Sequence, residues 1–321
     1  MRILNSSKFL SQPTFLQNAN DWFIYPQSII MVVSVLSGGL GNQLFQYAFG
    51  FRLARQLQTE LRLERHLLES QLLSRLRQYT HRQYELNVFA MEQTKASPFD
   101  TLNCLIRTLL PGRQAVLLRE SEFATLDTLI NYTAQIKEVI CLGYWQSEEY
   151  FKPEAEALRK QLIFQKRPAD STLSVAETIR SVNNATFVHI RRGDYVTNAN
   201  ANRHHGVCNK EYYNRSVRYL RERVSGTHFF VFSDNLAWVR RELGAILNPA
   251  TYVEHNTEAD SWQDMYLMSL CRHAIVANSS FSWWGAWLNS EGNRIVIAPQ
   301  HWFTANKSTQ LTVVPAHWTT L

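Results

Sequence analysis

The stretch IMVVSVLSGGLGNQLFQYAFGF, residues 30–51, joins an apolar run to a helical run through three glycines. Its first part, Ile30–Leu36, is short, apolar and rich in β-branched residues, which is typical of a buried strand. The part after the glycines, Gln43–Leu57, carries apolar residues at helical spacing. Glycines at such a junction let the backbone approach a ligand, and a helix N-terminus offers N–H groups to an anion. The stretch therefore predicts the first strand and helix of an α/β domain and a candidate anion site, with a plain tight turn as the alternative.

The same strand-then-helix order continues to the end of the chain, which indicates a parallel α/β architecture. Amphipathic spacing predicts helices over Tyr212–Arg223 and Trp262–Cys271. At 321 residues the chain is long enough for two domains, and its least patterned stretch is Phe164–Thr172. We therefore expect an N-terminal domain over residues 1–168 and a C-terminal domain over residues 169–321. Further strands are expected at Ala115–Arg119, Glu138–Leu142, Ala185–Ile190, His228–Phe232, His273–Ala277 and Arg294–Ala298.

Residues 1–30 lack the sustained apolar core of a secretory signal, and Met31 opens the first well-patterned stretch. We interpret them as an extension of the N-terminal domain or a misassigned start, and leave open whether they belong to the fold. No apolar run near the start approaches the roughly 20 residues that span a bilayer. No transmembrane segment is therefore expected, and peripheral association with a membrane is left open.

The four cysteines are widely spaced and form no C-x-x-C pair, which argues against a zinc site and against a disulfide framework. A cytoplasmic location is therefore expected. The four are Cys104, Cys141, Cys208 and Cys271.

The net charge of +6 and the pI near 9.2 raise the question of a polyanionic partner. The basic excess is shared between the two halves of the chain, however, and there is no basic tail. The densest cluster of arginines, Arg52–Arg82, lies among leucines at helical spacing, which is typical of solvated helix faces. We expect no nucleic-acid partner, and keep a basic nucleic-acid-binding or glycan-binding protein as the alternative of another class.

The stretch FVHIRRGDY, residues 187–195, carries a stronger signal, because an apolar strand ends there in two arginines. Parallel sheets bind ligands at the carboxyl ends of their strands. Guanidinium forks suit a diphosphate, since they make paired contacts with its oxygens. Arg191 and Arg192 alternate along the chain, so we expect one to face the ligand and the other to pair with a carboxylate, Asp194 being one candidate. Surface ion pairing alone is the alternative.

Two more predicted strands end in short polar side chains. Ser233–Asn235 follows the strand His228–Phe232, where a helix cap and a ligand site are equally compatible with the sequence. The stretch Asn278–Trp287 places two serines at the start of a helix, where hydroxyls and N–H groups suit phosphate oxygens. Its Trp284 and Trp287 are expected to pack in the core.

Several motifs are missing. No D-x-D carboxylate pair occurs, so the metal clamp that many nucleotide-sugar enzymes use is not visible. Two arginines and a helix N-terminus would have to neutralise a leaving diphosphate instead, without metal or cofactor. There is no G-x-S-x-G or H-E-x-x-H motif either, which argues against hydrolases.

Taken together, the motifs resemble the signature segments of the bacterial alpha-1,2-fucosyltransferases. The resemblance extends from about Met31 to Trp302. It departs from the commoner family pattern at Asn235, where a second acidic residue is often found, and in the extra N-terminal residues. The matching segments are Gly38–Tyr47, Gly143–Phe151, His189–Tyr195, Phe232–Asp234 and Ser279–Trp284.

The resemblance implies an α/β enzyme of the B-type glycosyltransferase fold, with two Rossmann-like domains facing across a cleft and GDP-fucose held mainly by the C-terminal half. The implied reaction is metal-independent and inverting, and moves L-fucose from GDP-fucose in alpha-1,2 linkage to a galactose of an oligosaccharide acceptor. A metal-independent glycosyltransferase with another nucleotide sugar, or one that makes another fucosyl linkage, remains an alternative.

The resemblance also implies residue roles. Arg191 would contact the diphosphate, and His189 would lie against the nucleoside. Asp264, 16 residues before Ser280, would read guanine, and Asn42 would lie near the transferred sugar. The catalytic residues expected are Arg191, Asp194 and Asn42. The residues expected to bind GDP-fucose are Gly39, Gly41, Asn42, His189, Arg191, Ser233, Asp234, Asp264, Asn278, Ser279, Ser280 and Phe281.

The sequence leaves the general base unassigned among Asp194, Glu148, His204 and His205, because no spacing chooses between them. It does not identify the acceptor, which loops in residues 60–165 would select, or the oligomeric state.

Overall fold

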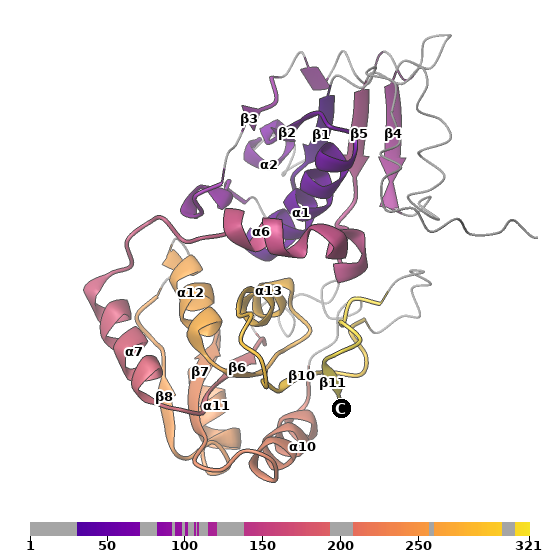
Figure 1. The fold of residues 1–321 in the computed structure, drawn as a ribbon. Helices are drawn as coiled ribbons and strands as arrows, with labels where there is room; N and C mark the ends of the chain where they lie inside the picture. Colours follow the sequence, from indigo (N-terminus) through magenta and orange to yellow (C-terminus); the bar gives the residue numbers. More distant parts are fainter. Residues whose placement is uncertain are drawn as a thin grey trace, which may run out of the picture.

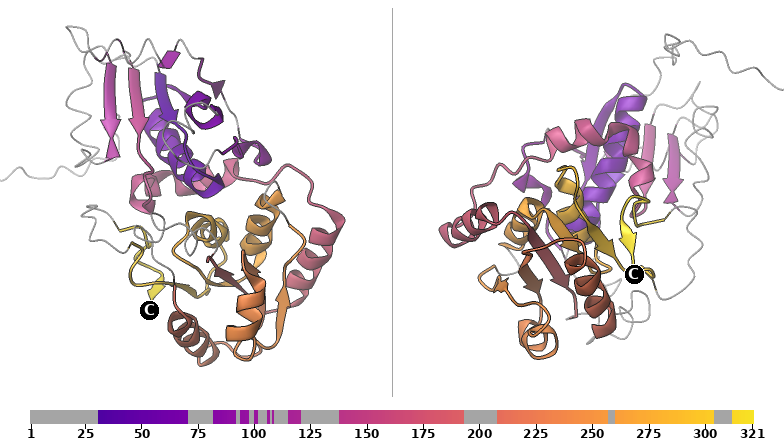
Figure 2. Two further views of the ribbon diagram at one scale, coloured as in Figure 1. Left: turned by 180° about the vertical axis from the view of Figure 1, so that it is seen from behind. Right: turned by 60° about the horizontal axis from the view of Figure 1, so that its bottom comes forward.

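The structure, a computed structural model, describes residues 31–70, 82–91, 94–97, 100–101, 106, 108, 115–120, 138–192, 208–256, 260–303 and 312–321. These residues form two parallel sheets with helices packed against them (Figure 1). Figure 2 shows the same two layered units from behind and from below, with the helices α1 and α13 between the sheets.

The first sheet has the strand order β3-β2-β1-β5-β4, and all its strands are parallel. The apolar stretch after Ile30 forms its central strand, which is buried along its whole length. The helix that follows the glycines is α1, with Phe45 and Phe49 among its buried side chains. The elements of this unit are β1 (Met31–Val35), α1 (Leu40–Gln56), β2 (Glu60–Glu64), α2 (His66–Glu69), η1 (Leu86–Val88), β3 (Thr94–Lys95), β4 (Ala115–Arg119), β5 (Glu138–Leu142), η3 (Glu148–Tyr150), η4 (Lys152–Glu154) and α6 (Ala155–Gln161).

The second sheet has the order β11-β10-β9-β6-β7-β8 and is also parallel. Its central strand β6 is buried throughout, as expected for a strand with helices on both faces. The elements are α7 (Asp170–Ser181), β6 (Ala185–Ile190), α10 (Lys210–Arg221), β7 (His228–Ser233), α11 (Leu236–Leu243), β8 (Ala250–Tyr252), α12 (Trp262–Leu270), β9 (His273–Ile275), α13 (Ser280–Leu288), β10 (Val296–Ala298) and β11 (Thr319–Thr320).

All seven predicted strands are present, with ends that differ by up to two residues. The interpretation of Arg52–Arg82 as helix faces is wrong over Glu60–Glu64, which forms β2 and pairs with β1. Charged and apolar residues alternate there with a period of two, which is the period of a strand and not of a helix. The domain boundary expected near residue 168 falls between α6 and α7 and stays a prediction.

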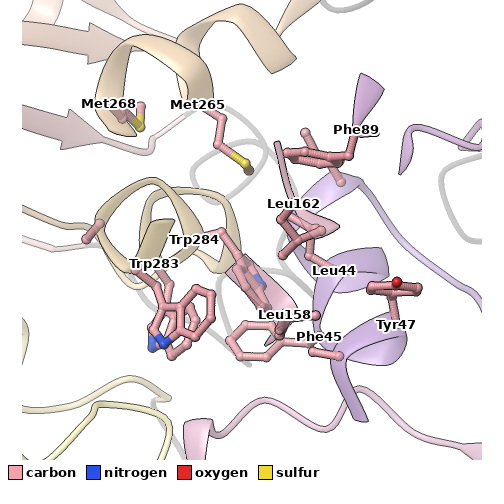
Figure 3. Close-up of a cluster of buried hydrophobic side chains, with 14 of the residues drawn as sticks. Leu44, Phe45, Tyr47, Phe89, Leu158, Leu162, Met265, Met268, Trp283 and Trp284 are labelled. Carbon is pink, nitrogen blue, oxygen red and sulfur yellow. The ribbon is translucent and has the colours of Figure 1, made fainter. Parts of the chain in front are cut away.

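The two sheets share one hydrophobic core, because α1 packs against α13. The ring of Phe45 lies 4.5 Å from Trp283 and 5.1 Å from Trp284, centroid to centroid (Figure 3). Phe151 stacks on Trp284 at 5.5 Å. Trp284 and Trp287 are fully buried, which confirms that they belong to the core.

Cys141, Cys208 and Cys271 are buried free thiols, whereas Cys104 lies outside the described residues. Within the described part of the chain, no helix is long and apolar enough to cross a bilayer.

Candidate active site

Two neighbouring strands of the second sheet bring Arg191 and Asp234 together. Ile190, the last residue of β6, is in register with Ser233, the last residue of β7. The guanidinium of Arg191 therefore lies beside the Asp234 carboxylate, with 3.1 Å between Nη1 and Oδ2. The other oxygen of Asp234 accepts a hydrogen bond of 2.8 Å from the backbone N–H of Arg192. About a third of the Arg191 side chain, 31%, stays exposed, so a ligand can reach it.

The second arginine lies against an aromatic ring. The Arg192 guanidinium is over the ring of Trp238, 3.9 Å from its centroid. Its expected pairing with a carboxylate stays a prediction. A planar guanidinium stacks well on an aromatic face, and Trp238 lies in the first turn of α11, which follows the neighbouring strand. The expected partner Asp194 lies outside the described residues.

The polar stretch after β7 is divided between the two roles that the sequence allowed. Asn235 caps α11, because its Oδ1 accepts a hydrogen bond from the Trp238 N–H at 3.1 Å. The Ser233 hydroxyl accepts one from the Asn235 N–H at 3.0 Å. Asp234 contacts the Arg191 guanidinium and the Arg192 N–H. Ser233 thus supports the cap, and Asp234 holds Arg191.

Helix α13 begins at the carboxyl edge of the same sheet, directly after β9, which pairs with β6. Ser279 is its N-cap residue but does not use its side chain as a cap. The first turn of a helix has N–H groups without helical partners, so this end suits an anion. Ser279, Ser280 and Phe281 are all half-buried, which leaves them accessible to a ligand.

Asn278 is placed differently from its neighbours. Its side chain is buried, its Oδ1 accepts a hydrogen bond from the Cys208 thiol at 3.5 Å, and its Nδ2 donates to the Trp302 carbonyl at 3.4 Å. These contacts tie the segment between β9 and α13 to Cys208 and Trp302. The expected contact of Asn278 with the donor stays a prediction.

His189 lies on β6 next to this helix start, and its ring centroid is 6.0 Å from that of Phe281. The side chain is 7% exposed. Burial, and then the nearby charge of Arg191, lower the pKa of His189 to about 3. The imidazole is therefore neutral at physiological pH, which fits packing against a nucleoside better than proton transfer.

The three glycines of the first motif have different surroundings. Gly38 has a φ of +74°, which favours glycine, and a Cβ there would lie 2.5 Å from Nδ2 of Asn42. Gly39 faces open space. A Cβ on Gly41 would lie 2.5 Å from the carbonyl carbon of Ser280. The start of α1 therefore touches the start of α13, and the glycine motif meets the serine motif where the two sheets face each other.

The start of α1 is already occupied by a carboxylate of the protein. Oε2 of Glu85 accepts a hydrogen bond of 2.8 Å from the N–H of Leu40, and burial raises the pKa of Glu85. The expectation of an anion at this helix start is therefore wrong for the Leu40 N–H. A diphosphate would be repelled by Glu85 here, whereas the start of α13 lies beside a sheet edge that carries Arg191.

Two functional side chains were missed by sequence reasoning, Gln43 and Gln46. Both are buried on α1. Gln43 donates to the Gly38 carbonyl at 2.9 Å, and Gln46 accepts from the Ser37 N–H at 2.9 Å and donates to the Gly143 carbonyl at 3.0 Å. They fix the loop that carries the glycines. The available signal was two amides on an otherwise apolar helix face, because buried amides need partners.

Asp264 lies in the first turn of α12. Helix α12 follows the parallel strand β8, so it begins at the same carboxyl edge of the second sheet as α13, and its Met268 lies against Gly285 of α13. Its Oδ1 accepts a hydrogen bond of 2.6 Å from Asn256, while burial raises the pKa of Asp264 to about 7. A half-buried carboxylate at this edge could accept hydrogen bonds from a base with two N–H donors, such as guanine.

Glu148 is not placed as a general base. It is buried, and its Oε1 accepts a hydrogen bond of 2.8 Å from Trp287 Nε1. Trp287 lies in the last turn of α13, about 10 Å along the helix from Ser280. Glu148 therefore connects the two units at the opposite end of α13. The other candidates, Asp194, His204 and His205, lie outside the described residues.

We expect Glu148→Gln to lower stability and leave the turnover of the folded protein unchanged. Burial lowers the pKa of Arg159 and that of Arg294, the latter to about 10, and the Glu148 carboxylate opposes both shifts. Removing the charge leaves Glu156 and Glu291 as the carboxylates that oppose these shifts, at a cost of about 1 kcal/mol. Urea unfolding and kcat below the melting transition measure the two effects. A large loss of kcat at unchanged stability would instead support Glu148 as the general base.

Two α/β units with parallel sheets, and an arginine and a helix start at the carboxyl edge of one of them, fit a glycosyltransferase of the B-type fold. The chain belongs to glycosyl transferase family 11, whose model matches residues 31–321. The family resemblance drawn from the motifs is thus confirmed.

Two relatives from Escherichia coli are similar over nearly their whole length. An alpha-1,2-colitosyltransferase is 35% identical over 302 residues, covering 90% of this chain and 98% of the relative. The O-antigen biosynthesis glycosyltransferase WbnK is 33% identical, covering 87% and 97%. The galactoside alpha-(1,2)-fucosyltransferase 1 of Saimiri boliviensis boliviensis is 26% identical over 162 residues, which are 49% of this chain and 44% of that protein.

Among solved structures, a variant of Arabidopsis thaliana FUT1 in complex with GDP superposes with a TM-score of 0.51 at 13% identity, covering 86% of this chain and 72% of that one. At this identity the likeness concerns the fold alone. It confirms the predicted B-type α/β class.

Proposed function

We propose that this glycosyltransferase moves L-fucose from GDP-fucose, with inversion, to the 2-hydroxyl of a galactose in an oligosaccharide acceptor. The observation that carries the proposal is the convergence of Arg191 and the half-buried start of α13 at one edge of the second sheet. Both suit the two charges of a diphosphate.

The relatives support the linkage and the kind of sugar. The names of the E. coli colitosyltransferase and of the Saimiri enzyme both specify an alpha-1,2 linkage. Colitose is L-fucose without its 3-hydroxyl, so the two sugars share the 6-deoxy ring and differ at one position. A donor that carries colitose is therefore the second candidate.

The proposed chemistry places most of the catalytic effect on the leaving group. The bond between the sugar and the phosphate breaks with oxocarbenium character, so negative charge develops on the departing diphosphate. Arg191 would hold its oxygens with two N–H groups, and the N–H groups at the start of α13 would add their dipoles. Asp264 would select guanine, and the neutral ring of His189 would pack against the nucleoside.

The test is transfer from GDP-fucose to a galactose-terminated oligosaccharide in the presence of EDTA, with the product identified by mass and its linkage by NMR. We expect an alpha-1,2-fucosylated product without added metal. The GDP derivative of colitose, tested in parallel, decides between the two sugars. No transfer from either donor to any acceptor of this kind would contradict the proposal.

Thermal shifts with GDP, UDP and CDP test the alternative of another nucleotide, and GDP is expected to stabilise most. For the alternative of a protein that binds nucleic acid or another polyanion, the relevant measurement is affinity against salt concentration in wild type and in an Arg191 variant. A steep salt dependence that is independent of Arg191 would favour that class.

Asp264→Asn is expected to raise stability at high pH and to weaken GDP binding. The pKa of Asp264 is higher in the fold than in the unfolded chain. Its contribution to stability is therefore complete below about pH 4 and is lost as the pH rises to about 7. At pH 8 the variant should melt at a higher temperature than wild type, and the gap should narrow at pH 5.

The same variant should lose most of the thermal shift that GDP gives, because an amide cannot accept both guanine donors. Asp170→Asn is the matched control, since Asp170 is 90% exposed and lies outside the site. Equal GDP shifts in wild type and Asp264→Asn would remove Asp264 from the nucleotide site.

A further inference from the structure

The loop after β5, residues 143–147, has an unusual backbone at Trp145. This residue has a φ of +56°, in the left-handed region that bulky side chains rarely adopt. Its ring is fully buried and stacks on Phe49 at 3.9 Å between centroids, with Tyr150 edge-on at 5.3 Å. The N–H of Ser147 donates to the Trp145 carbonyl at 2.8 Å and closes a tight turn. Packing thus holds a conformation that costs free energy, which is common at functional sites.

The turn aims Gln146 at the glycine motif. Nε2 of Gln146 donates a hydrogen bond of 2.8 Å to Oδ1 of Asn42, in the first turn of α1. The two residues are 104 positions apart in sequence. A primary amide has one acceptor end and one donor end. Because Gln146 takes the acceptor end, the donor end is what Asn42 presents to its other neighbours.

The donor end of Asn42 points along the glycine turn. Its Nδ2 lies only 2.5 Å from the position that a Cβ on Gly38 would take, so any other residue at position 38 would clash with it. Gly41, the residue before Asn42, touches the backbone of Ser280. Asn42 therefore lies where the start of α1 meets the start of α13, beside the proposed diphosphate site, and is half-buried.

We propose that Gln146 is a positioning residue that fixes the amide of Asn42 so that its N–H groups face an oxygen of the donor substrate. The oxygen would belong to the transferred sugar or to the departing phosphate, and the inference rests on the proposed function. A donor fixed in advance stabilises developing negative charge without reorganisation at the moment of reaction. The strained turn at Trp145 holds Gln146 in reach.

A double-mutant cycle between Gln146→Met and Asn42→Ala tests this inference. Methionine keeps the length and volume of the side chain but cannot donate. We expect Gln146→Met to lower kcat about tenfold in the wild-type background, as an oriented donor is lost. In the Asn42→Ala background it should have no further effect, because Gln146 acts through Asn42. The KM for the acceptor should change little.

Controls separate positioning from stability. Gln165→Met is the matched substitution, since Gln165 also donates to a carbonyl distant in sequence, that of Asn87, but is exposed. It should leave kcat unchanged. Thermal melts of all variants report folding.

If Gln146→Met fails to fold, Gln146→Glu replaces it. Glutamate keeps the size and polarity of the side chain but offers only acceptors, so the amide of Asn42 should rotate by about 180° to donate to it. We therefore expect kcat to fall when Asn42 is present and to be unchanged in the Asn42→Ala background.

Additive effects of the two substitutions on kcat would overturn the role of Gln146, as would wild-type kcat in Gln146→Met. Either outcome would leave the proposed function intact, because the wild-type protein would still transfer fucose. Absence of transfer by wild type would overturn both.

Discussion

Arg191→Lys is expected to lower kcat/KM for GDP-fucose by about 100- to 1,000-fold, the loss seen when one donor to a developing charge is removed. Lysine keeps the positive charge and can still pair with Asp234. It cannot reproduce the planar fork, whose N–H groups reach the carboxylate and a phosphate oxygen at the same time. The loss should appear mainly in kcat, because the charge on the leaving diphosphate grows in the transition state.

The neighbouring arginine gives a matched control. Arg192→Lys makes the same chemical change one residue along, on a side chain that stacks on Trp238. A lysine can also lie over an aromatic ring, so a loss below about threefold is expected. Steady-state kinetics with both substrates measure the two variants. Equal losses would mean that the strand end needs arginines for its structure, and near-normal turnover of Arg191→Lys would remove its diphosphate role.

The contrast between these arginines shows where sequence reasoning reached its limit. The end of the strand Ala185–Ile190 and its two arginines could be read from the local pattern. The carboxylate that holds Arg191 could not, because it depends on which strand lies beside β6. Asp234 is 43 residues further along, and only the pairing of Ile190 with Ser233 brings it into contact. The expectation that Asp194 pairs with the other arginine stays a prediction, because Asp194 lies outside the described residues.

The same reason explains the error at the start of α1. A glycine turn before a helix is locally compatible with an anion, and nothing near Leu40 argues against it. The carboxylate that accepts the hydrogen bond from the Leu40 N–H belongs to Glu85, which is 45 residues later in the sequence and follows β2 and α2. By contrast, the start of α13 was readable, since its serines and the strand before it are adjacent in sequence. Local motifs predicted which polar and charged side chains lie at the ends of strands and helices. The order of the strands in the sheet determines which of these side chains contact one another.

Gly41→Ala is expected to disrupt both folding and activity, because Gly41 is in direct backbone contact with the other unit. A methyl group there would lie 2.5 Å from the carbonyl carbon and 2.7 Å from the carbonyl oxygen of Ser280. These atoms are backbone at the start of a helix, so relief requires α13 to move away from α1. Such overpacking costs about 1–3 kcal/mol, and more where the neighbour cannot shift.

The effect on activity should exceed the effect on stability. The start of α13 is the proposed phosphate site, and Asn42 is adjacent to Gly41, so moving one helix changes the distance between the groups that hold the donor. A displacement of about 1 Å between reacting groups can cost 100-fold in rate. We expect a loss of about that size in kcat, together with a lower melting temperature.

Gly39→Ala is the control for folding, since a Cβ there meets nothing within 4 Å and its φ of −81° suits alanine. It should melt like wild type. A change in the KM for GDP-fucose alone would then show that the donor approaches this backbone, as the motif predicts. If Gly41→Ala also melted like wild type and kept its kcat, the contact between α1 and α13 would not set the geometry of the site. The two units would then have to come together through Phe45, Trp283 and Trp284, which pack one turn further along both helices.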